Sequence, residues 1–309
     1  MPQTHRVTAP RRAVRVVGAL ALLALAPACS LQRLTSRVAV QLIDDGVTAI
    51  NAEADLELAR ASSGASLKLL DALLEQDSAN DRLLLSASEG YVGYATAFAG
   101  RDRVRASVLY TRARDYALRA WTAWLRGQPP LSPAAPRLDA ATLVADATAL
   151  DAALARGADA VPYAYWTAAS WSGLIDVNRG DPALLADLPI VRRLAHFVAE
   201  RDSGFAFGGA DLLLGVMAGA VPAVAGGDPD AARDHFERAL AAAERRFLMT
   251  QVLYAETYAI AQQDRALFDQ LLDEIAAADI DLLPEQRLAN VVAKERGAAL
   301  RARADRLFL

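Results

Sequence analysis

The sequence predicts an all-α protein built as an array of helical hairpins. Alanine, leucine, arginine and glutamate, which favour helices, dominate a chain of 309 residues that is 54% hydrophobic and 23% charged. Apolar residues recur at spacings of three and four, as in 67–74 and 267–275. The sequence offers no convincing run of alternating β-branched residues, so we predict no sheet.

A triplet of small, large and small residues occurs three times, with three and then two residues between its members. Its members are Ala65, Leu69 and Ala72; Ala106, Tyr110 and Ala113; and Ala232, Phe236 and Ala239. This spacing is typical of the second helix of a tetratricopeptide repeat, where small residues let paired helices approach and the large one fills the groove. The distances between triplets vary, so we predict degenerate tetratricopeptide-like repeats that stack into an α-α superhelix.

Residues 1–28 are predicted to be a lipoprotein signal peptide. Four arginines and no acidic residue surround the start of an apolar stretch at 16–26, and small residues follow it. The stretch is shorter than the ~20 residues of a membrane-spanning helix, and the small residues indicate a cleavage site. Arg11 and Arg12 leave open whether export uses the general secretory or the twin-arginine route.

Cys29, the only cysteine, follows this leader directly. A single cysteine excludes an intramolecular disulfide and a cysteine-based metal cluster. We predict that Cys29 receives a diacylglycerol, because two or three acyl chains anchor a protein firmly to a membrane. The alternative is a chance cysteine in a spent leader. The expected location is the periplasmic face of a bacterial membrane, with the outer membrane favoured over the inner.

The rest of the chain, 29–309, is predicted to be a single helical domain. Asp181-Pro182 and Asp228-Pro229 each predict a helix start, since aspartate caps a helix and proline fits its first position. A proline-rich connection at 127–136 interrupts the helices, and we interpret it as a link between two halves of the domain.

The segment 205–226 holds a single charged residue, Asp211, and five glycines. A membrane span is one interpretation, but glycine costs helix stability and a central aspartate is expensive in lipid. We therefore predict a helix that is buried within the protein and no transmembrane segment.

An aromatic segment at 163–171 carries the most unusual chemistry of the chain. Tyrosine and tryptophan combine apolar area with a polar group, as ligand pockets and protein interfaces require. The alternative is that these rings pack between hairpins, and we expect at least one of them to face a cavity. The candidate ligand or partner surface consists of Tyr163, Tyr165, Trp166, Trp171 and Asn178.

Catalytic groups are hard to find in this sequence. His196 and His235 are the histidines beyond the leader, and neither has a metal-ligand partner at motif spacing. The glycine pairs lack the features of a phosphate loop, and no serine lies in a nucleophile elbow. We predict no metal, no cofactor and no enzymatic activity. The net charge of −4, more negative without the leader arginines, argues against a nucleic-acid partner.

Motifs along most of the chain resemble those of the TatT family, the T components of tetratricopeptide-associated TRAP transporters. The first is the segment 161–166, followed by Trp171, Asp181-Pro182 and the segment 187–189. The others are Leu31-Gln32-Arg33-Leu34 and the segments 233–240, 254–256, 262–265, 287–290 and 304–309. The chain departs from the family pattern in its proline-rich connection and in a short link at 100–103.

The resemblance implies a periplasmic lipoprotein that helps solute uptake and associates with a substrate-binding P component. It also implies a cavity or channel that holds or passes a small, partly apolar ligand. From the residues alone, a helical-hairpin array offers a concave surface for another chain or an elongated ligand. Two alternatives stay open: a scaffold lipoprotein that grips peptides in envelope assembly, and an enzyme whose carboxylates converge only on folding. Homo-oligomerisation is also left open.

Overall fold

The computed structural model describes residues 45–100, 102–129, 140–220 and 227–308. The chain divides into two compact units, Met1–Asp45 and Gly46–Leu309, and only the second is described below. The predicted signal peptide, Cys29 and residues 130–136 of the proline-rich connection lie outside the described residues.

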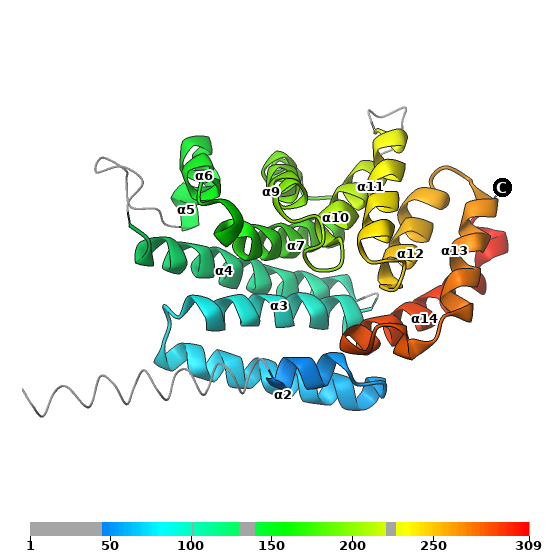
Figure 1. Cartoon of the computed structure of the whole chain (residues 1–309), viewed down its shortest axis with the longest axis horizontal. Helices are drawn as coiled ribbons and strands as arrows, with labels where there is room; N and C mark the ends of the chain where they lie inside the picture. The colour runs from blue at the N-terminus through cyan, green and yellow to red at the C-terminus, as the bar shows by residue number, and fades with distance from the viewer. Residues whose placement is uncertain (1–44, 101, 130–139, 221–226, 309) are drawn as a thin grey trace, which may run out of the picture. The chain divides into compact units, whose positions relative to one another are not determined.

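The described part of the chain is helical and contains no strand, which confirms the predicted all-α class (Figure 1). A π-helical turn, Ala255–Ala259, continues α12, and single 3₁₀ turns connect other elements. The α-helices are α2 (Leu56–Gln76), α3 (Asp81–Phe98), α4 (Arg103–Gly127), α5 (Ala140–Ala145), α6 (Ala147–Leu154), α7 (Val161–Val177), α8 (Pro182–Leu185), α9 (Leu188–Arg201), α10 (Gly209–Gly219), α11 (Pro229–Ala242), α12 (Met249–Tyr254), α13 (Arg265–Ala277) and α14 (Arg287–Arg301).

Acidic and amide side chains set most helix starts. Asp181 accepts a hydrogen bond from the backbone N–H of Ala183, and Asp228 accepts one from Ala231, so α8 and α11 begin at the prolines that follow. Both predicted starts are confirmed. Asn80 caps α3 in the same way through Leu83. Each cap satisfies a backbone donor that a helix leaves unpaired at its first turn.

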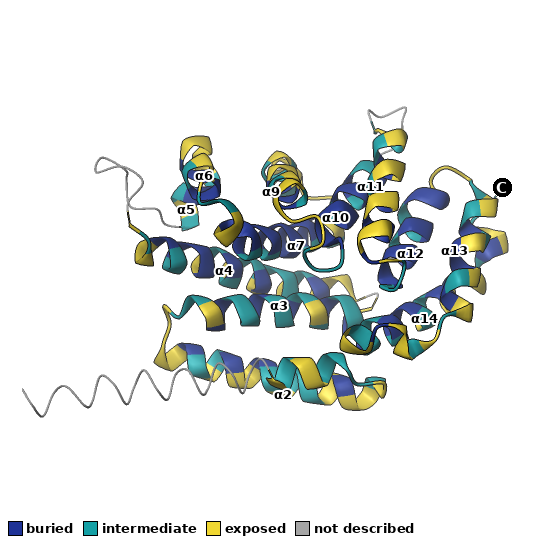
Figure 2. Ribbon diagram, viewed as in Figure 1, coloured by how far each residue is buried: buried dark blue, intermediate teal, exposed yellow. Residues whose placement is uncertain are grey.

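Successive helices pack against their neighbours, and one helix is enclosed. Helix α3 packs between α2 and α4, and α4 packs on α7. Helix α7 in turn contacts α9 and α10, and its residues are buried on nearly every side (Figure 2). A helix that is apolar all round belongs in the interior of a protein, and α7 therefore forms the centre of this half of the unit.

Two of the three predicted triplets have opposite outcomes. Ala232, Phe236 and Ala239 on α11 are all fully buried. The triplet on α2 faces solvent: Leu69 is 56% exposed, and its two alanines are exposed as well. The prediction that this triplet packs within a hairpin is wrong, because α2 turns its other leucine face, including Leu67 and Leu70, onto α3.

The segment that raised the question of a membrane span contains α10, which is short and mostly buried. Gly208 precedes it with φ +77°, and a Cβ there would lie 2.9 Å from the backbone oxygen of Ala239. Position 208 therefore requires glycine for two reasons: its φ is positive, and the backbone of Ala239 leaves no room for a Cβ. Among the described residues, no helix combines the length and apolar character that crossing a membrane would need.

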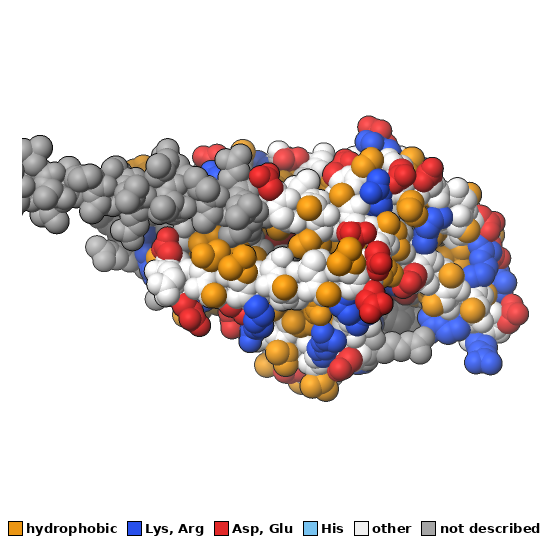
Figure 3. All heavy atoms as spheres, turned by 90° about the horizontal axis from the view of Figure 1, so that it is seen from below, with side chains coloured by type: hydrophobic (Ala, Val, Ile, Leu, Met, Phe, Trp, Pro, Cys, Tyr) orange, Lys and Arg blue, Asp and Glu red, His pale blue; other side chains and the backbone are white. Residues whose placement is uncertain are grey.

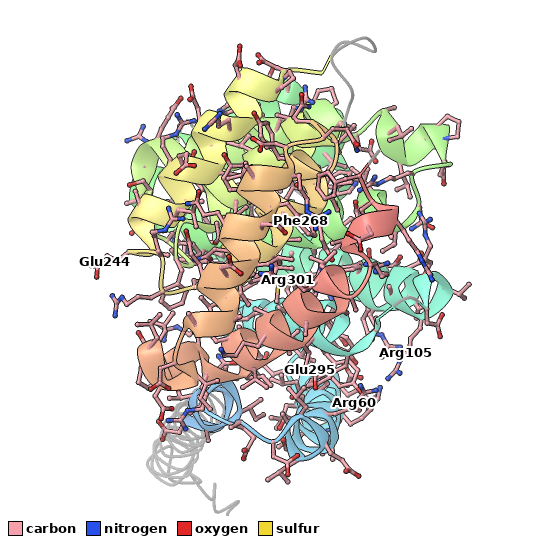
Figure 4. The ribbon with its side chains drawn as sticks, turned by 90° about the vertical axis from the view of Figure 1, so that its right-hand side faces the viewer. Arg60, Arg105, Glu244, Phe268, Glu295 and Arg301 are labelled. Carbon is pink, nitrogen blue, oxygen red and sulfur yellow. The ribbon has the colours of Figure 1, made fainter. Side chains whose placement is uncertain are left out.

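The end of the unit packs against its beginning. Helix α14 contacts α2, and Arg287 donates a hydrogen bond to the backbone oxygen of Ala52 at 2.9 Å. Ala59 on α2 and Phe98 on α3 share one hydrophobic core with α11–α14. Figure 4 looks onto this end, where α14 lies beside the tip of α2 and Phe268 on α13 points into the core.

Candidate ligand site beside Trp171

Helix α7 carries most of the predicted site and gives its residues different surroundings. Tyr163, Tyr165 and Trp171 are buried, with exposed fractions of 7%, 9% and 3%. Trp166 and Asn178 are half-buried. The structure thus places these five residues around a central helix rather than on one open surface.

Tyr163 and Asn178 bind other groups of the protein. The Tyr163 ring stacks on Trp124 of α4 with ring centroids 4.8 Å apart, and its hydroxyl donates to Asp81 Oδ2 at 2.5 Å. Burial and this bond raise the pKa of Tyr163. Asn178 donates to Ser107 Oγ at 2.9 Å. Both side chains therefore join α7 to neighbouring helices.

Tyr165 is held in an aromatic cage. Its ring centroid lies 4.9 Å from that of Trp166 and 5.2 Å from that of Phe205, both in edge-on geometry. Burial raises the pKa of Tyr165. A Cβ at Gly209, the first residue of α10, would lie 2.2 Å from the Tyr165 hydroxyl oxygen. The chain therefore needs a glycine where α10 crosses this ring.

Trp171 lines a hollow of about 320 Å³. This volume is at the lower end of the range of ligand sites. The hollow lies between α4, α5, α7 and the turn before α9, and it contains one cation and one anion among mostly apolar walls. Its lining residues are Arg114, Leu118, Ala140, Ala141, Val144, Trp171 and Asp187.

Arg114 packs its guanidinium over the indole of Trp171, with Cζ 5.4 Å from the ring centroid. Its nearest carboxylate is that of Asp115, at 3.7 Å, which is too long for a hydrogen bond. Arg114 Nε is shielded from solvent and has no acceptor among the described residues. This cation is therefore held mainly by packing on an aromatic ring, a weak interaction that leaves its donors available.

Asp187 lies at the nitrogen edge of the same indole. The Trp171 Nε1–H donates to Asp187 Oδ2 at 3.2 Å. Asp187 occupies the N-cap position of α9 but makes no capping hydrogen bond to that helix. Its carboxylate thus turns towards the hollow and Trp171 instead of satisfying the backbone of its own helix.

Arg114 and Leu118 were missed by sequence reasoning, and Asp187 was noticed only as part of a family motif. The two α4 residues are four apart and so lie on the same helix face. That spacing is common in an arginine- and leucine-rich chain. Only the packing of α5 and α7 beside Arg114 and Leu118 distinguishes this pair from other pairs with the same spacing. Tyr163, Tyr165 and Asn178 are not among the residues that line the hollow.

A second polar cluster joins α10 and α11. Buried Asp211 lies 2.7 Å from His235 Nδ1 and accepts from Arg238 Nε at 3.0 Å. Burial alone would raise the pKa of Asp211, but the bonds from His235 and Arg238 outweigh it and lower that pKa. Exposed His196 lies beside His235, with ring centroids 5.8 Å apart, and desolvation followed by the charge of His235 lowers its pKa. Within the described ranges, no group of three or more potential ligand side chains is placed to hold a metal ion.

The described part of the chain is thus an all-helical fold with a small hollow at the edge of its central helix. A family model for the TRAP transporter T-component matches residues 52–308. The chain belongs to this TAtT family. It is thus an accessory component of a TRAP transport system, which works in the cell envelope. No curated protein matches the chain.

Proposed function

We propose that this accessory component is anchored by a lipid on Cys29 at the periplasmic face of the membrane. There it binds the substrate-binding P component of its transport system and holds a small, partly apolar ligand. The family match over residues 52–308 carries the proposal. The hollow beside Trp171 supports the ligand-holding part, because it combines apolar walls with two charged side chains.

The outer face of α2 suits the partner-binding part. Leu58 and Leu69 are 55% and 56% exposed. They are eleven residues apart, which is close to three helical turns, and exposed Ala65 and Ala72 lie on the same stripe. The equivalent small and large residues of α11 are buried under neighbouring helices. In the part of the chain that the structure describes, the stripe on α2 is exposed and can receive a helix of another chain.

The surroundings of this stripe suit a partner that binds and leaves. Figure 3 shows the molecule from the side on which α2 lies in Figure 1, with hydrophobic side chains interspersed among basic and acidic ones. Lys68, whose side chain is 68% exposed, borders the stripe. A mixed apolar and charged surface is typical of non-obligate interfaces, whereas permanent interfaces are more apolar.

The test is co-purification of the P component with this chain after both are produced together. Leu58→Glu and Leu69→Glu should each reduce the recovered P component, because a buried carboxylate without a partner opposes association. Val104→Glu is the matched control, since Val104 is 79% exposed but lies on α4. Unchanged recovery with both α2 variants would contradict this surface. Recovery of many envelope proteins and no P component would favour the scaffold alternative.

A further inference from the structure

The two charges in the Trp171 hollow have opposite sign and incomplete partners. The Arg114 guanidinium donates no hydrogen bond to any described residue and faces the indole. The Asp187 carboxylate receives the indole N–H on one oxygen, and its other oxygen has no donor in the described part of the chain. Both groups contact the same ring from different sides. A ligand in this hollow therefore meets a cation and an anion together.

We propose that the hollow binds a small zwitterion with an apolar body, such as an apolar amino acid, with Arg114 holding its carboxylate and Asp187 its ammonium group. The proposal rests on the proposed ligand-holding function and names the chemical class of its ligand. Arginine can hold a carboxylate through two parallel hydrogen bonds. Leu118, Val144 and Ala141 supply the apolar wall for the body of the ligand.

The two charges of the hollow favour a zwitterion over a ligand that carries only a carboxylate or only an amine. A plain carboxylate would gain Arg114 but meet the like charge of Asp187, and a plain amine would gain Asp187 but meet Arg114. In a site that is shielded from water on several sides, such like-charge contacts are penalised more than on an open surface. A volume of about 320 Å³ also favours a small molecule over a long acyl chain or a peptide.

The test uses isothermal titration calorimetry on the purified full chain with three probes of similar shape. L-Leucine carries both charges, 4-methylpentanoate lacks the ammonium group, and 3-methylbutylamine lacks the carboxylate. We expect L-leucine to bind at least about tenfold more tightly than either of the other probes.

Variants then assign the two charges. Arg114→Met and Asp187→Asn should each weaken leucine binding by at least about tenfold. Arg119→Met is the matched control, because Arg119 lies on the same helix and packs over Tyr116 at the same 5.4 Å. Ala141→Trp gives an independent test from an exposed position: it should fill the hollow and abolish binding while thermal stability is retained.

Three results would overturn the proposal. The first is tight binding of 4-methylpentanoate that becomes tighter in Asp187→Asn, and the second is tight binding of the amine that becomes tighter in Arg114→Met. The third is the absence of leucine binding, or leucine binding that survives Ala141→Trp. Co-purification of the P component is measured in the same preparations, so that a wrong ligand class is distinguished from a wrong partner function.

Discussion

Replacing Gly209 by alanine should destabilise the protein, although alanine is the better helix former. The added Cβ would lie 2.2 Å from the Tyr165 hydroxyl oxygen and 2.7 Å from two ring carbons. Ordinary contact begins at ~3.5 Å, so the hydroxyl would have to move by roughly 1 Å. Trp166 and Phe205 flank the ring and oppose this movement.

The expected loss follows from the cost of overpacking. Forcing an extra methyl group into a packed site costs about 1–3 kcal/mol. For a protein of this size, each kcal/mol lowers Tm by roughly 2–4 °C. The measurement is urea unfolding followed by circular dichroism, with thermal melting as a second readout. The slope against urea should stay unchanged, because the surface exposed on unfolding does not change.

Two control variants make the test specific. Gly93 lies inside α3, and a Cβ there would meet no atom within 4 Å. Gly93→Ala should therefore stabilise the protein by about 0.5–1 kcal/mol. In a Tyr165→Leu background, Gly209→Ala should cost less than about 0.5 kcal/mol, since the opposing ring is gone. Equal effects of Gly209→Ala with and without Tyr165, or a gain in stability, would refute the steric argument.

Three further outcomes are expected. Burial alone would raise the pKa of Asp71, but hydrogen bonds from Lys68, Tyr116 and Tyr91 lower it. A carboxylate with a lowered pKa stabilises the folded state at neutral pH, and this stabilisation is lost on acidification. Between pH 7 and pH 3, wild type should therefore lose more stability in urea unfolding than Asp71→Asn does. Asp211→Ala should cost about 1–3 kcal/mol in urea unfolding because it leaves His235 without its buried carboxylate, and an unchanged midpoint would contradict that role. Cys29→Ser should abolish membrane retention in fractionation and the mass added by lipid, whereas normal retention would place the anchor elsewhere.

Local sequence signals predicted the helices better than their packing. Aspartate followed by proline identified two helix starts, because a cap and the first helical residue are neighbours in sequence. The triplet at Leu69 failed because its spacing defines one helix face and does not show which face meets another helix. That choice is made by α3, which packs on the Leu67 side of α2.

The candidate site was predicted only in part, for a similar reason. Trp171 was selected by composition and does line a hollow, whereas Tyr163 was selected by the same criterion and binds Asp81. A sequence shows that an aromatic ring has a polar handle but not which group will bind it. Arg114 comes from α4 and Asp187 from the turn before α9, and both reach Trp171 only when these segments fold onto α7.

The contact between α14 and α2 has a consequence for how the chain folds. In an open array of repeats, each unit can fold on its neighbour as soon as both are made. Here Ala59 completes its surroundings only when helices from the opposite end of the chain arrive. Contacts between distant parts of a sequence slow folding. A chain that emerges amino end first can cover the Leu67 side of α2 with α3 at once, but the surroundings of Ala59 stay incomplete until the last helix is released.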